Sequence, residues 1–206
     1  AVGNLPWYLK FLAFLAGIRG NEKKGLEYLN LAAEKGKYVA DQAKALQMVL
    51  MVREKNFKEA LDQARNLHRK YPRSFLLHLN RAQIFEKMKK PMAAAEDYLE
   101  VLRWAEEGKP NYSQINLPIF RFSVAKKFMQ LKLLPMALEQ FQNVKENSET
   151  PKRERTLSCL QIGKIFDLQG KRSEAVTQYE RVLKIEDFEG SHKKARSFLR
   201  RRYSTR

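Results

Sequence analysis

The residues that could carry out chemistry are few and far apart in this sequence. Its three histidines, His68, His78 and His192, do not stand at the spacings of metal ligands, and no HExxH pattern occurs. The single cysteine, Cys159, has no histidine near it in the sequence that could act as a base. Glycine-rich phosphate loops and the GxSxG pattern are also absent. We therefore predict a protein that is not an enzyme, has no metal or other cofactor and no small-molecule substrate, and buries Cys159 as an inert thiol.

The composition favours a folded, all-helical protein. The chain has 206 residues, of which 44% are hydrophobic, and this is enough for one domain or one short solenoid. Its 9 glycines and 7 prolines are too few for a chain of many short strands and tight turns. We expect the all-α class, with long helices and short connections.

A small residue recurs at nearly regular intervals, each time at the start of an amphipathic segment. These residues are Gly25, Ala60, Ala94, Ala137 and Ala175. They are separated by 35, 34, 43 and 38 residues, and two of these four intervals are close to a repeat period of about 34 residues. The longer intervals contain apparent insertions, at residues 106–118 and 146–155. The spacing predicts a helical repeat protein.

The residues around these positions resemble the tetratricopeptide family, which places small and aromatic residues at fixed positions in each helix pair. The third copy has Ala82, Phe85, Ala94 and Tyr98, and the fifth has Gly163, Phe166, Ala175 and Tyr179. The resemblance implies a right-handed α-α superhelix of about five helix pairs in one domain, residues 1–206. It places the repeats at about 6–39, 41–74, 75–108, 118–151 and 156–189, and a basic capping helix at 190–206.

Several local signals indicate where the second helices of the pairs begin. Asn56 is followed by Glu59, which predicts a capping box at the start of one helix. Pro91 and Pro135 stand where two other second helices should start, and a missing N–H is harmless in the first turn of a helix.

In this family the first helix of each pair lines a concave binding face. The predicted ligand-facing residues are Leu46, Val49, Leu76, Leu79, Asn80, Gln83, Ile119, Phe122, Lys126, Leu157, Gln161 and Lys164. This stripe is apolar with a few lysines, so we expect it to bind a helical or extended peptide with apolar anchors and acidic groups. Alternatively, other parts of the chain cover some of the stripe. The clamp with which chaperone-binding members hold a C-terminal carboxylate is absent, because Ala45 and Val49 occupy two of its positions.

The positive charge suggests a second kind of partner. The net charge is +17, and residues 191–206 contain no acidic residue. Their basic residues include Lys193, Lys194, Arg196, Arg200, Arg201 and Arg202. Together with Phe198 and Tyr203, they could bind the phosphates of a nucleic acid or an anionic membrane, and this is the alternative prediction for function.

The first segment is rich in aromatic residues. Trp7, Tyr8, Phe11 and Phe14 crowd one short predicted helix, which we expect to pack on the second repeat and on further chain, or in a homodimer. The apolar stretch of residues 5–18 is interrupted by Lys10 and is shorter than the roughly 20 residues of a membrane span. We expect a soluble domain, cytoplasmic or periplasmic, with any signal or anchor before the first residue.

Overall fold

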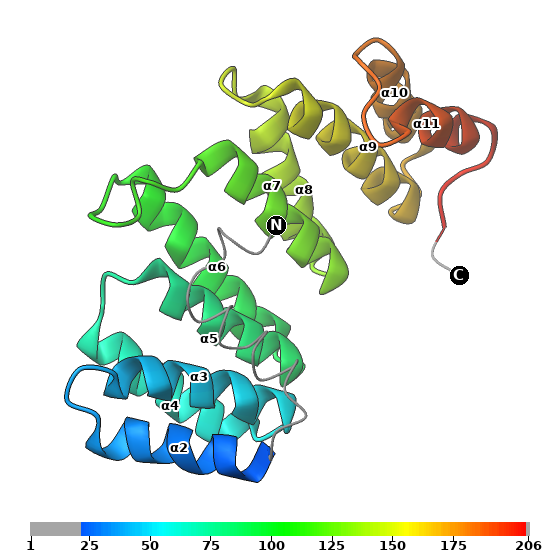
Figure 1. Cartoon of the computed structure of the whole chain (residues 1–206). Helices are drawn as coiled ribbons and strands as arrows, with labels where there is room; N and C mark the ends of the chain where they lie inside the picture. The colour runs from blue at the N-terminus through cyan, green and yellow to red at the C-terminus, as the bar shows by residue number, and fades with distance from the viewer. Residues whose placement is uncertain (1–21, 205–206) are drawn as a thin grey trace. The chain divides into compact units, whose positions relative to one another are not determined.

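The structure is a computed structural model that describes residues 22–204 (Figure 1). Within this range the chain forms ten helices and no strands, which confirms the all-α prediction for the described part. The helices are α2 (Glu22–Lys35), α3 (Ala40–Arg53), α4 (Phe57–Lys70), α5 (Phe75–Lys87), α6 (Pro91–Glu106), α7 (Leu117–Gln130), α8 (Leu134–Glu146), α9 (Lys152–Leu168), α10 (Arg172–Leu183) and α11 (Ser191–Arg200). None of these helices is both long enough and apolar enough to cross a membrane.

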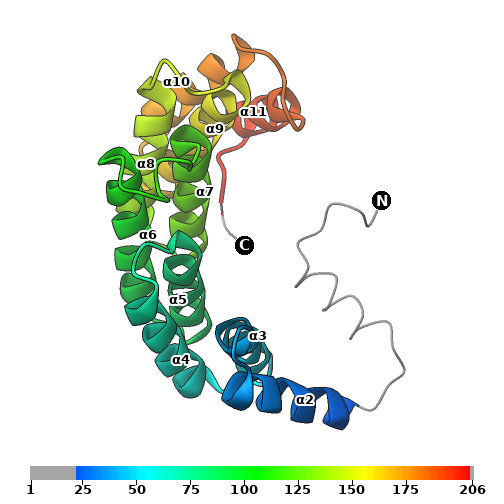
Figure 2. The ribbon, with the colours of Figure 1, turned by 60° about the vertical axis from the view of Figure 1, so that its left-hand side comes forward.

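The chain divides into two compact units, residues 1–90 and 91–206, called here the N-terminal and C-terminal units. The boundary falls within the third predicted repeat. In each unit, helices that follow one another along the chain pack side by side, as α3 does on α4 and α9 on α10. In the C-terminal unit, α9 also contacts α7 and α11, and Figure 2 shows these helices next to one another.

Four turns between the helices of predicted pairs share one backbone conformation. Each has a residue in the left-handed region: Lys55 (φ 68°), Lys89 (φ 56°), Lys132 (φ 61°) and Gly170 (φ 75°). The next N–H donates to a carbonyl five residues back, for example from Lys171 to Phe166 at 2.8 Å, which is the Schellman arrangement. The four residues are 34, 43 and 38 residues apart, the same intervals as the small residues of the sequence. The backbone conformation of the turns therefore repeats with the same spacing as the small residues.

The small residues of the pattern lie where helices approach closely. Ala60, Ala94, Ala137 and Ala175 have no exposed surface. A Cβ on Gly163 of α9 would lie 2.5 Å from Cε1 of Tyr179 on α10, so only glycine fits there. Four of the five small residues of the pattern are thus fully buried, whereas Gly25 is partly exposed.

The helix starts were predicted in part. Pro91 begins α6 and Pro135 lies in the first turn of α8, as expected. The capping box is wrong, because Asn56 precedes α4 but its side chain makes no capping hydrogen bond. The N–H of Asn56, from which Glu59 would accept in a capping box, donates instead to the carbonyl of Met51 at 2.8 Å in the Schellman turn.

The capping helix is shorter than predicted, and part of the first repeat is not described. α11 begins at Ser191, near the expected start, but ends at Arg200, and residues 201–204 are not helical. The predicted first helix with Trp7, Tyr8, Phe11 and Phe14, and the homodimer built on it, lie outside the described residues.

Candidate functional site

A hollow of the C-terminal unit lies between α7, α9 and α11. We call it the C-terminal hollow, and its volume is about 250 Å³. It is lined by Phe122, Lys126, Leu157, Leu160, Gln161, Lys164, Glu189, Lys194 and Phe198. Five of the predicted ligand-facing residues meet here with one residue of the predicted anion-binding tail, Lys194. The structure thus brings together residues that the sequence assigned to two separate sites.

The cations of this hollow have no acidic partner. Among the described residues, no carboxylate pairs with Lys126, Lys164 or Lys194. The ammonium of Lys194 instead donates to the backbone carbonyl of Glu189 at 2.8 Å. The Lys164 ammonium lies 4.4 Å from the ring centroid of Tyr203. Burial lowers the pKa of Lys164, and the positive charge of Lys194 lowers it further.

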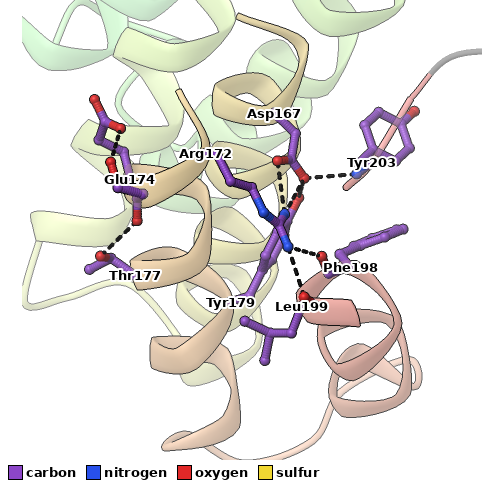
Figure 3. A network of polar contacts seen from close by, with 9 residues as sticks. Asp167, Arg172, Glu174, Thr177, Tyr179, Phe198, Leu199 and Tyr203 are labelled. Atoms are coloured by element: carbon purple, nitrogen blue, oxygen red, sulfur yellow. Dashed lines mark hydrogen bonds and ion pairs between the residues drawn. The ribbon is translucent and has the colours of Figure 1, made fainter. Parts of the chain in front are cut away.

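A buried carboxylate fixes the wall that α11 contributes (Figure 3). The side chain of Asp167, at the end of α9, is only 1% exposed. It accepts hydrogen bonds from the Tyr179 hydroxyl at 2.8 Å, from Arg172 at 3.0 Å and from the backbone N–H of Tyr203 at 2.8 Å. Burial raises the pKa of Tyr179, and its bond to Asp167 adds to the effect, so the phenol remains a donor.

The same network caps the last turn of α11. The second guanidinium nitrogen of Arg172 donates to the carbonyls of Phe198 and Leu199, both at 2.8 Å. These are carbonyls that the end of a helix leaves without partners. Tyr203 returns toward α9 and packs edge-on against Phe198, with ring centroids 5.3 Å apart. α11 and the four residues after it are therefore attached to α9 and α10 by one connected set of bonds.

The start of α11 is also held in place. Asp187 accepts hydrogen bonds from the Ser191 hydroxyl at 2.9 Å and from the N–H of His192 at 3.0 Å. These two donors lower the pKa of Asp187, since they favour its charged form. The third wall of the C-terminal hollow is thus positioned at both of its ends.

A smaller hollow lies in the N-terminal unit, between α3 and α5. This N-terminal hollow measures about 110 Å³ and is lined by Met48, Val49, Val52, Asn80, Gln83, Ile84 and Lys87. Three of the predicted ligand-facing residues, Val49, Asn80 and Gln83, lie here. Its lining is mostly apolar, with two amides and one lysine.

The twelve predicted ligand-facing residues have different environments. Val49, Leu76 and Ile119 are large apolar side chains that are 46%, 55% and 41% exposed. Leu76, Leu79 and Ile119 line neither hollow. Phe122 and Leu157 are buried and form the floor of the C-terminal hollow. Leu46 lines neither hollow, and its side chain packs in a core cluster formed by α2 and α3.

The six residues of the predicted anion-binding tail are exposed. Lys193, Lys194, Arg196 and Arg200 lie on α11, whereas Arg201 and Arg202 follow its end. Of these six residues, only Lys194 lines the C-terminal hollow. Reasoning from the sequence missed Glu189 as a lining residue and Asp167 as the anchor of α11, because both look like ordinary carboxylates of a solvated surface.

The cysteine lies in the core of the C-terminal unit. Cys159 is buried in an apolar cluster with Leu160, Tyr179 and Val182, as predicted. Burial raises the pKa of its thiol, which disfavours the nucleophilic thiolate form.

The comparisons with known proteins do not assign a family. No protein-family model matches the chain, and no curated protein matches it in a sequence search.

Proposed function

We propose that this protein is a non-enzymatic interaction scaffold of the tetratricopeptide type, built as a right-handed superhelix, which binds a helical or extended peptide of a partner protein. One observation carries the proposal: both hollows lie between first helices of successive predicted pairs. α3 and α5 form the N-terminal hollow, and α7 and α9 form two walls of the C-terminal hollow. These are the helices to which the repeat register assigns ligand binding.

Exposed apolar side chains on the same helices support the proposal. Val49, Leu76 and Ile119 are exposed large apolar residues, and each occupies a position that the repeat register predicts to face the ligand. Apolar side chains kept at the surface favour contact with another protein over contact with water. An amphipathic peptide offers the complementary apolar anchors.

A displayed library of random short peptides, selected against the whole chain, tests this function. We expect enriched peptides, each of which loses binding to Val49→Glu or to Lys126→Glu, since these substitutions place a carboxylate in one of the two hollows. Met92→Glu is the matched control, because Met92 is 55% exposed but lies on a second helix, α6. A selection that enriches nothing, or only peptides that tolerate both hollow variants, would contradict the proposal.

A further inference from the structure

Three ammonium groups face the C-terminal hollow from three different helices. Lys126 belongs to α7, Lys164 to α9 and Lys194 to α11. The only carboxylate of the lining, that of Glu189, is already bound by the guanidinium of Arg153. The hollow therefore has a surplus of positive charge that no described acidic side chain offsets.

Lys164 is the most constrained of the three cations. Its side chain is half-buried, and it contacts the face of the Tyr203 ring rather than an anion. The lowered pKa of Lys164 agrees with this geometry, since burial penalises its charged form. An unpaired charge that has lost part of its water is unfavourable, and a bound anion would offset that cost.

The floor of the hollow is apolar and requires a different group from the ligand. Phe122, Leu157 and Leu160 are buried lining residues, and Phe198 on α11 is half-buried. The cavity of about 250 Å³ is large enough for one or two side chains. A ligand that fits must therefore present an anionic group and a bulky apolar group close together.

The arrangement favours a peptide over a nucleic acid or a membrane. A phosphate backbone is bound by rows of exposed basic residues, and the exposed arginines Arg196, Arg200 and Arg202 do not line the hollow. Glu189 at the rim also disfavours a chain of phosphates. In a peptide, by contrast, an acidic side chain presents a single negative charge, and the residues next to it can be apolar.

We infer that the C-terminal hollow binds an aspartate or glutamate side chain together with a neighbouring leucine, isoleucine or phenylalanine of the same partner peptide. This inference rests on the proposed function and makes it specific for one site. The carboxylate contacts Lys164, with Lys126 and Lys194 on either side, and the apolar side chain packs on Phe122 and Leu157.

The test uses peptides selected from the displayed library against the whole chain and measured by fluorescence anisotropy. We expect one group of enriched peptides to combine an acidic residue with an adjacent large apolar residue. Lys164→Met should weaken their binding at least about tenfold, as should replacing the acidic residue of the peptide by its amide. Lys193→Met is the matched control, because Lys193 is exposed on α11 but does not line the hollow.

A stability measurement separates binding from folding. Lys164→Met removes a half-buried charge that has no carboxylate partner among the described residues, and with it the contact with the Tyr203 ring. These two effects oppose each other, so the midpoint of urea unfolding should change little while peptide binding weakens. Lys126→Met, at an exposed position, provides a second variant that should weaken the same peptides without affecting the fold.

Other outcomes would overturn the inference in distinguishable ways. If peptides lose binding only to Val49→Glu and tolerate both lysine variants, the inference fails and the proposed function stands. If no peptide responds to any hollow variant, both fail. Single-stranded DNA or phosphatidylserine vesicles that bind through Lys164 more tightly than any acidic peptide would assign the hollow to phosphate instead.

Discussion

The two hollows are built at corresponding places on first helices, yet they differ in charge and in walls. The N-terminal hollow has two walls, α3 and α5, and a single lysine, Lys87. The C-terminal hollow has a third wall, α11, and three lysines that pair with no carboxylate in the described part of the chain. The third wall comes from the capping segment, which adds Lys194 and Phe198 and brings Tyr203 next to Lys164. The other two lysines, Lys126 and Lys164, belong to α7 and α9 themselves. A capping helix can thus shape a binding site as well as close a core.

The largest expected effect comes from removing the clamp that holds α11. Arg172→Met leaves the buried Asp167 carboxylate without its cation and the end of α11 without its cap. Arg172 is itself 38% exposed, so we expect a loss of about 2–3 kcal/mol in the free energy of urea unfolding, below the full value for a buried pair.

Amide hydrogen exchange can show whether the destabilisation by Arg172→Met is confined to the C-terminal unit. Amides of α11 should lose protection in Arg172→Met, whereas those of α3 and α5 should not. Arg181→Met, at an exposed position on the same helix α10, is the control and should change little. Equal effects of the two substitutions would show that the clamp does not hold the third wall.

The second prediction concerns how the helices of a pair approach each other. Gly163 and Tyr179 form a small–large combination in α9 and α10, whereas the matching positions of the N-terminal unit hold Met48 and Ala64 in the reverse order. Gly163→Ala should cost about 1–3 kcal/mol of unfolding free energy, because the new methyl group collides with a buried ring.

A substitution at the matching position of the N-terminal unit should have a smaller effect on the free energy of unfolding. Met48→Leu nearly conserves volume and should cost less than about 1.5 kcal/mol. Thermal or urea unfolding measures both. If Gly163→Ala is neutral, α9 and α10 can separate without loss, and the close approach at Gly163 is not required.

The smallest expected effect tests a feature that the two units share. Lys55 and Lys132 adopt a left-handed conformation that is unfavourable for a residue with a Cβ. Lys55→Gly and Lys132→Gly should each raise the free energy of unfolding by about 0.5 kcal/mol, after the greater freedom of glycine in the unfolded chain is subtracted.

A control at a helical position should give the opposite sign. Lys58→Gly, in the first turn of α4, should lower the free energy of unfolding by up to about 1 kcal/mol. Urea titration can resolve the two directions. A gain at Lys55 without a gain at Lys132 would mean that the turns of the two units are not equivalent.

Much of the helical pattern could be predicted from local sequence. The recurring alanines are fully buried and Gly163 leaves no room for a Cβ, and the spacing of these small residues is visible in the sequence. Pro91 and Pro135 likewise mark helix starts through their own backbone chemistry. The helix starts depend on residues near one another in the chain. The small residues are recognisable because each copy of the repeat has one at the same position.

Two kinds of feature could not be predicted. In one, two hydrogen bonds compete for the same backbone group, and in the other, the contacting residues are far apart in the sequence. The N–H of Asn56 could have joined a capping box, but the preceding turn uses it. Asp167 looks like any helix-surface carboxylate until Tyr203, 36 residues later, returns to it. Leu46 has the register of a binding residue, and its burial follows from packing with Leu29 of α2. The C-terminal hollow is a site of this kind, because α11 completes it.

The attachment of Tyr203 has a mechanical consequence. A pulling force applied at residue 204 meets the hydrogen bond from the Tyr203 N–H to Asp167 before it reaches the end of α11. That bond and the two from Arg172 to the carbonyls of Phe198 and Leu199 would carry the load together. Under tension we therefore expect the C-terminal segment to resist until these three bonds break together. α11 should then unwind, and gradual fraying from its end should not occur.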